Sequence, residues 1–208
     1  MPSRFVVRKL KEHCIYHIYN RGAEDKSIFR DTQDFRVFLF YLFVYTTPID
    51  KVIQRFSDLP RRLREKTLLG KLEVLAYTLL PDRFHLIVCQ HQIDGMPKLM
   101  KQTINGYTAY YNQKYKHKGP VFAGRYKAVE VPEDNLADMV RHVHRKQGDL
   151  NYEWSSYGKY IGKESFLDCD IDEVMDKFGT RGEFIGFHSN TSDYQRSLER
   201  IKDLVIEN

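Results

Sequence analysis

Cysteine is scarce in this chain of 208 residues, and long apolar segments are missing from it. The three cysteines, Cys14, Cys89 and Cys169, lie far apart, are odd in number and form no CxxC pair. This pattern argues against a disulfide framework or a structural zinc site and favours a reduced, cytoplasmic protein. The longest run without a charged residue, Val37 to Ile49, is too short to cross a bilayer and is typical of a buried helix. We therefore expect no membrane partner.

The composition is that of one globular core with an appendage. The mean hydropathy is −0.54, and 42% of the residues are hydrophobic. The first ten residues contain Arg4, Arg8 and Lys9 but no apolar core, so no signal peptide is expected there. The chain shows no internal repeat and no low-complexity segment. We expect a domain over residues 1–162, followed by an acidic helical C-terminal extension over residues 163–208.

Acidic residues are absent from one long stretch of the chain. Between Lys98 and Lys127 there are seven basic residues and no aspartate or glutamate, whereas the residues from Glu164 onward carry a net charge of −6. A charge run is often only a solvated helix face. An acid-free stretch of this length favours contact with a polyanion, and we expect it to bind nucleic acid.

Hydrophobic patterning predicts four strands and three main helices in the first 145 residues. Residues 14–19 alternate and end at Asn20-Arg21-Gly22, and residues 72–79 and 84–88 form a hairpin around Pro81-Asp82. A helix capped by Asp31 and a second opened by Pro97 precede a strand over residues 126–131 and a helix after Pro132. The order β-α-β-β-α-β predicts an α+β fold of the ferredoxin-like, split βαβ type. It is an antiparallel sheet with helices on one face, plus a C-terminal helical extension.

The start of the third predicted strand carries the most informative residues. Arg83 and His85 stand two apart, so both point to the same face of the sheet. Two histidines at this spacing could hold a metal ion, but here one of them is an arginine. A guanidinium stays protonated and has no lone pair to donate.

Several short segments, taken in their order along the chain, resemble a known family. The set resembles the single-tyrosine HUH transposases, most closely their branch associated with repetitive extragenic palindromes, over about residues 13–162. The segments are Tyr16-His17-Ile18, Asn20-Arg21-Gly22, Phe29-Arg30-Asp31 with Asp34, Leu80 to His85, Gly119 to Phe122, Gly124 to Lys127 and Trp154 to Tyr157.

The resemblance implies a concrete activity. Such proteins bind imperfect DNA hairpins and cut single-stranded DNA by attack of a tyrosine on a phosphodiester, which leaves a 5′-phosphotyrosine. A divalent ion held by two histidines and a polar third ligand polarises the scissile phosphate. The cofactor of an active member would be Mg or Mn. Family members occur as monomers and as dimers, so a homodimer is left open.

Both catalytic devices are altered in this chain. Arg83 occupies the first metal-ligand position, so His85 is a degenerate ligand and we expect no metal or other cofactor. The tyrosine position is occupied by His142, in the run His142 to Gln147, and helical spacing predicts that this residue points off the core. We therefore expect lost or weakened nicking and strand transfer.

The DNA contacts are then expected from basic residues alone. Arg83 could hold a phosphate with its bidentate guanidinium in place of the metal. The predicted nucleic-acid-binding residues are Arg21, Arg83, Lys114, Lys116, Lys118, Arg125, Lys127, Arg141 and Arg145.

Two other functions remain open from the sequence. One is an active, metal-dependent single-strand transposase with a displaced nucleophile, although Tyr107, Tyr110, Tyr111 and Tyr115 are more typical of a packed helix face. The weaker one is an RNA-binding module, for which the aromatic signature of RNA-reading sheets is missing.

Overall fold

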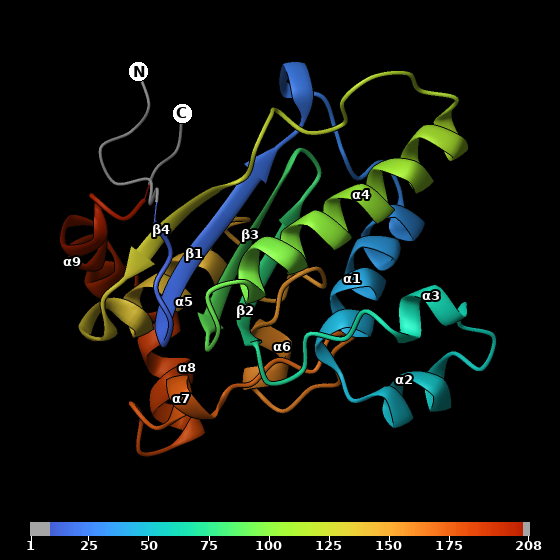
Figure 1. The fold of residues 1–208 in the computed structure, drawn as a ribbon. Helices are drawn as coiled ribbons and strands as arrows, with labels where there is room; N and C mark the ends of the chain where they lie inside the picture. The colour runs from blue at the N-terminus through green and yellow to red at the C-terminus, as the bar shows by residue number, and fades with distance from the viewer. Residues whose placement is uncertain (1–8, 206–208) are drawn as a thin grey trace.

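The computed structural model describes residues 9–205, and its centre is a four-stranded antiparallel sheet. The strands are β1 (Cys14–Arg21), β2 (Leu72–Leu80), β3 (Arg83–Gln90) and β4 (Lys127–Val131), and their order across the sheet is β2-β3-β1-β4. Helix α1 (Thr32–Thr46) connects β1 to β2, and α4 (Gly95–Tyr115) connects β3 to β4 (Figure 1). The predicted β-α-β-β-α-β order and the ferredoxin-like α+β fold are confirmed.

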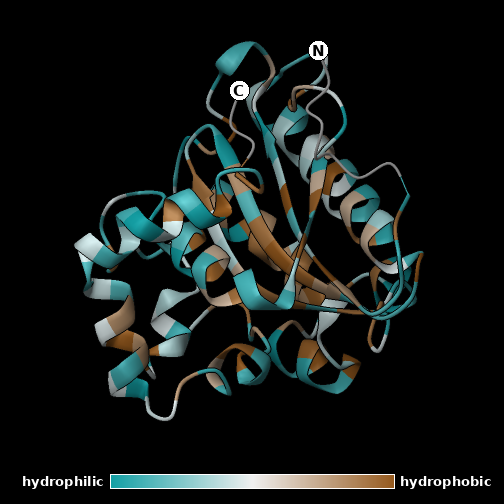
Figure 2. Ribbon diagram, turned by 90° about the vertical axis from the view of Figure 1, so that its left-hand side faces the viewer, coloured by the Kyte–Doolittle hydropathy of each residue, from teal (hydrophilic) through white to brown (hydrophobic). Residues whose placement is uncertain are grey.

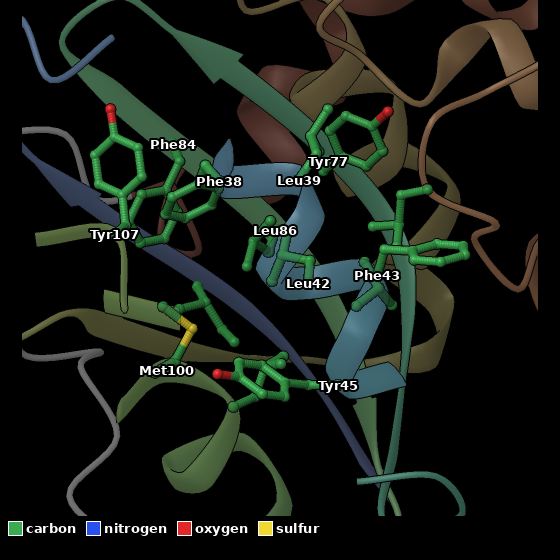
Figure 3. Packing of buried hydrophobic residues seen from close by; sticks show 14 of the residues in the cluster. Phe38, Leu39, Leu42, Phe43, Tyr45, Tyr77, Phe84, Leu86, Met100 and Tyr107 are labelled. Atoms are coloured by element: carbon green, nitrogen blue, oxygen red, sulfur yellow. The ribbon is translucent and has the colours of Figure 1, made fainter. Parts of the chain in front are cut away.

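Helices α1 and α4 cover one face of the sheet. The carboxylate of Asp31 caps α1 by accepting a hydrogen bond from the Asp34 N–H at 3.1 Å, as the sequence predicts. Phe38 and Leu42 of α1, which lie one turn apart, meet Phe84 and Leu86 of β3 in the main core (Figure 3). Tyr107 of α4 packs into the same cluster and donates its hydroxyl to the Ile28 carbonyl. This face is therefore closed by aromatic packing.

The opposite face is also covered, which corrects the expectation of helices on one face only. Helix α5 (Leu136–His144) packs on β2 and β3, and α8 (Arg181–Ser189) and α9 (Thr191–Ile201) pack around it. The physical reason lies in the strands, because Ile15, Ile87 and Val131 point to this second face and need apolar cover. Figure 2 shows apolar residues concentrated on the strands between the two helical layers.

The acidic C-terminal segment thus packs on the sheet through α5. Its helices are the short α7 (Asp172–Met175), α8 and α9, so the expected C-terminal helical extension is confirmed. The expectation for the first ten residues falls mostly outside the described range.

The remaining elements are short. The segment between α1 and β2 contains α2 (Ile49–Arg55) and α3 (Arg61–Arg64). Single turns occur at Ala23–Asp25, at Glu133–Asn135 and in α6 (Tyr157–Tyr160). All three cysteines are free. Within residues 9–205 we find no helix long and apolar enough to span a membrane.

Candidate nucleic-acid interface

Basic residues distant in the sequence meet at one end of the sheet. The registers place Arg21, the last residue of β1, opposite Arg83, the first residue of β3, and place Lys127 of β4 opposite Tyr19. The loop before β4 is tied to the same end, because the Ala123 N–H donates to the Arg21 carbonyl at 2.8 Å. We call this region the basic end. It comprises Arg21, Arg83, Lys116, Lys118, Arg125 and Lys127.

A glycine makes this convergence possible. Gly22 bridges to Phe122 of the loop, and its N–H donates to the Asp82 carbonyl at 2.8 Å. A Cβ atom on Gly22 would lie 1.9 Å from the Lys26 carbonyl oxygen, so no other residue fits without moving the backbone. The Asn20 amide also donates to the Gly124 carbonyl at 3.2 Å. Hydrogen bonds thus join the Asn-Arg-Gly segment to three other segments of the resemblance, namely Leu80 to His85, Gly119 to Phe122 and Gly124 to Lys127.

The cations of the basic end differ in how far they are neutralised. Arg21 pairs with the exposed Asp25 at 2.8 Å, and Arg83 pairs with Asp82 at 2.7 Å. The Arg21 pair is exposed and the Arg83 pair is partly exposed, and pairs that reach the solvent contribute little to stability. Lys116, Lys118 and Arg125 are exposed and form no salt bridge within residues 9–205. These three cations are the most available to an external phosphate.

Lys114 lies in a different environment from the other predicted contacts. Its ammonium group contacts Asp31 at 2.7 Å and the fully buried Asp34 at 2.8 Å, which ties α4 to the start of α1. Burial by itself would raise the pKa of Asp34, but hydrogen bonds from Lys114 and from the Arg30 N–H bring that pKa below its ordinary value. An ammonium shared by two carboxylates has little charge left for a phosphate. Its geometry therefore favours a structural role.

Arg141, predicted to lie on a basic surface, is fully buried. Its guanidinium pairs with Asp138 at 3.0 Å and with Asp193 at 2.8 Å, and it lies 3.7 Å from the centre of the Phe187 ring. The prediction fails because α8 and α9 cover this side of α5, which the helical spacing of α5 alone could not reveal. Arg145 is half-buried and donates to the His188 carbonyl at 2.6 Å.

Beside the basic end, two histidines from neighbouring strands face each other. His85 Nδ1 lies 3.0 Å from His17 Nε2, and the two rings stack at 5.3 Å between centres. Tyr19 stacks on both rings, at 5.7 Å from His17 and 5.8 Å from His85. Burial lowers the pKa of His17 to about 3 and that of His85 well below its ordinary value, so both are neutral at physiological pH. Sequence reasoning missed His17, because its partner depends on the strand register.

These residues do not fit a divalent metal ion. The His17–His85 hydrogen bond occupies one ring nitrogen of each histidine, and Arg83 adds a positive charge on the same strand. Within residues 9–205 no group of three or more histidine, cysteine, aspartate or glutamate side chains is arranged to hold a metal. A catalytic metal needs several such donors. We therefore derive no reaction step through a metal.

His142, at the predicted nucleophile position, is buried rather than pointing off the core. Only 5% of it is exposed, because α9 lies over it, and its Nδ1 is 3.0 Å from the Tyr194 hydroxyl. Burial is the main cause that lowers the pKa of His142 to about 2. Lys146, four residues after His142, is half-buried, and burial followed by the nearby Arg83 charge lowers its pKa to about 7.

His144, two residues further on, belongs to a separate buried network. His188 Nδ1 donates to the Phe184 carbonyl at 3.1 Å, so a neutral His188 must accept from His144 Nδ1 at 3.1 Å. His144 Nε2 then accepts from the Ser156 hydroxyl at 2.8 Å. The Tyr77 N–H donates to that hydroxyl oxygen at 2.9 Å, which also fixes the Trp154 to Tyr157 segment against β2. A serine–histidine contact resembles a nucleophile and its base, but Ser156 is fully buried, so the network is structural.

Comparisons with solved structures give two distant likenesses that bear on this chain. No protein-family model and no curated protein matches this chain. A solved REP-associated tyrosine transposase bound to a REP hairpin matches with a TM-score of 0.48 and 11% identity, over 79% of this chain and 91% of that one. A bacterial tRNA(His) guanylyltransferase-like protein in complex with GTP matches with a TM-score of 0.40 and 12% identity, over 69% of this chain and 65% of that one. Both TM-scores are below 0.5, so neither likeness assigns a function to this chain.

Proposed function

We propose that this chain is a transposase-like protein that binds single-stranded or hairpin DNA without cutting it. The observation that carries the proposal is the basic end, where three strand ends and one loop gather six cations that are distant in the sequence. Arginine and lysine neutralise phosphates and release counterions, which is the main source of affinity for a DNA backbone.

The arrangement of the resembling segments supports the choice of DNA. Asn20-Arg21-Gly22, Pro81 to Arg83 and Phe122 to Arg125 are joined by backbone hydrogen bonds, such as Gly22 N–H to the Asp82 carbonyl at 2.8 Å. The Ile28 and Phe29 N–H groups both donate to the Pro81 carbonyl, at 2.8 and 2.9 Å. The segments that resemble the hairpin-binding family thus form one connected unit around the cations.

The same geometry supports binding without cleavage. Arg83 stands where the resemblance requires a metal ligand, and His85 is hydrogen-bonded to His17 instead of facing an open site. The nucleophile position holds a buried, neutral histidine. The ligand pair is thus incomplete, and among residues 9–205 no group of three or more histidine, cysteine, aspartate or glutamate side chains is arranged to hold a metal ion.

Binding is tested by the fluorescence anisotropy of a labelled hairpin of single-stranded DNA at several salt concentrations. We expect the logarithm of the binding constant to fall linearly with the logarithm of the salt concentration. We also expect Arg83→Gln and Arg125→Gln to weaken binding and make that slope shallower by about one unit each. Affinity that does not depend on salt or on either arginine would overturn the proposal, and tighter binding to the matching RNA hairpin would favour the RNA-binding alternative.

One contact favours the second candidate, an enzyme with a displaced nucleophile. The Tyr194 hydroxyl lies 3.0 Å from His142 Nδ1. In such an enzyme the phenolic oxygen would attack phosphorus, the bond from phosphorus to the 3′-oxygen would break, and the phenolic proton would pass through His142 to that departing oxygen. Such an enzyme would form a covalent adduct that Tyr194→Phe abolishes. Hairpin binding without any adduct in the presence of magnesium or manganese excludes it.

A further inference from the structure

A second basic surface lies away from the basic end, between the helices of the other layer. A groove of about 780 Å³ is lined by α4 on one side and by α1 and α3 on the other. On the α4 side, the lining residues recur at intervals of three or four positions from Lys98 to Gln113. The groove therefore follows one face of that helix. Fifteen residues of helix correspond to about 22 Å. The groove therefore extends along much of α4.

All charged residues that line the groove are basic. Arg62, Lys66, Lys98 and Lys101 line it, and none of its lining residues is acidic. Lys98 is paired with Asp94. The other three are exposed and form no salt bridge within residues 9–205. An uncompensated row of cations along a groove favours a linear polyanion.

Tyrosine rings supply the other element that a single strand needs. Tyr41, Tyr45 and Tyr110 line the same groove, and Tyr41 is half-buried and stacks on Tyr45 at 6.1 Å. A Cβ atom on Gly106 would lie 2.7 Å from the Tyr41 ring, so the glycine lets the edge of this ring approach α4 closely. Unpaired bases stack on aromatic rings of this kind, whereas a duplex keeps its bases inside.

A buried acceptor completes the groove. Gln102 Oε1, on the α4 wall, is buried and has no hydrogen-bond partner within residues 9–205. A buried oxygen without a donor is costly, and a ligand that brings an N–H group to it would remove that cost.

We propose that this groove binds single-stranded DNA, with phosphates on Arg62, Lys66 and Lys101 and a base stacked on Tyr41. Toward its C-terminus, α4 continues to Lys116 and Lys118. These two residues begin the loop that belongs to the basic end. A hairpin held at the basic end would then send its single-stranded tail along α4. This continuity rests on the proposed function, whereas binding of a strand in the groove can be measured by itself.

The test uses the full chain and three DNA probes: an oligo-dT of twenty nucleotides, a blunt hairpin, and the same hairpin with a dT tail. The groove variant is Arg62→Glu/Lys101→Glu. The matched control, Lys51→Glu/Lys202→Glu, reverses two exposed lysines outside the groove and changes the net charge equally. We expect the groove variant to weaken binding of oligo-dT and of the tailed hairpin about tenfold more than the control does, and to leave the blunt hairpin within about twofold.

A second pair of variants tests stacking without changing charge. Tyr41→Phe keeps a ring and should retain the affinity for oligo-dT, whereas Tyr41→Leu should lose about tenfold. Circular dichroism and thermal unfolding verify that both variants are folded. Equal affinities of the leucine and phenylalanine variants would exclude a stacked base.

The outcomes separate this inference from the proposed function. If the groove variant binds oligo-dT as well as the control does, the groove inference is wrong even though hairpin binding persists. If oligo-dT binding depends on the groove while the blunt hairpin does not bind, the groove stands and the proposed role of the basic end fails. Tighter binding of oligo-rU through the same residues would overturn the assignment to DNA, and binding of neither probe would overturn both.

Discussion

Two residues of one helix, His142 and His144, lie in environments that differ in one decisive way. His144 belongs to a network in which His188, Ser156 and the backbone of β2 meet every donor and acceptor. His142 lies on the side of α5 that faces His17 and His85, near Arg83 of the basic end and near Lys146. The polar groups around His144 are satisfied by hydrogen bonds with one another. His142, in contrast, borders a surface whose positive charge suits an anion. A cluster of histidines therefore says little about function by itself, and the charge of the residues around the cluster says more.

The largest difference between the two regions is expected when His144 is replaced. His144→Ala leaves Ser156 and His188 without their buried partner and opens a cavity, so the free energy of unfolding should fall by about 3 kcal/mol. Urea unfolding measures this loss. Hairpin affinity, measured where the variant is still folded, should stay within about twofold, and a specific loss of affinity would show that the two regions are not separate.

Charge reversal at the basic end should produce the opposite result. Arg125→Glu/Lys127→Glu should reduce hairpin affinity at least about tenfold and make the salt slope shallower by about two, because both cations lie beside β1 without a buried partner. The free energy of unfolding should change by less than about 0.5 kcal/mol. Lys51→Glu/Lys202→Glu is the matched control, and an equal loss of affinity in it would reduce the effect to net charge.

Acid should destabilise the protein through the buried histidines. Burial lowers the pKa of His17 and of His188 to about 3, so the unfolded chain binds more protons than the folded one below pH 6.5. Stability is therefore complete above pH 6.5 and is lost as the pH falls toward 3, by about 1.4 kcal/mol per pH unit for each histidine that stays neutral. Urea unfolding at pH 7, 6, 5 and 4 measures the slope. His17→Gln should reduce this slope by the contribution of about one proton. An unchanged slope would contradict the assignment of His17 as a buried, neutral histidine.

The fold was largely predictable from local patterns, whereas the site was not. Period-two alternation and the Asp31 cap located the strands and α1, and the order of elements fixed the topology. The burial of Arg141 and His142 depends on α8 and α9, which reach α5 from about fifty residues away. The His17–His85 contact depends on strand register, which a single sequence does not reveal. The convergence of Arg21, Arg83 and Lys127 follows once that register is known.

The smallest effect is expected at the contact between α9 and α5. Tyr194→Phe removes one hydroxyl from His142, so the free energy of unfolding should fall by about 1 kcal/mol, and hairpin affinity should not change. Thermal unfolding and anisotropy measure the two quantities. A large drop in DNA affinity would mean that Tyr194 contacts the nucleic acid.

The most direct test incubates the wild-type protein with a labelled hairpin of single-stranded DNA and with magnesium or manganese. The products are separated on a denaturing gel, and a parallel gel-shift assay measures binding. We predict a salt-sensitive complex, no cleaved strand and no protein–DNA adduct that survives denaturation. An adduct or a nicked product, lost in Tyr194→Phe or His142→Ala, would contradict binding without cleavage.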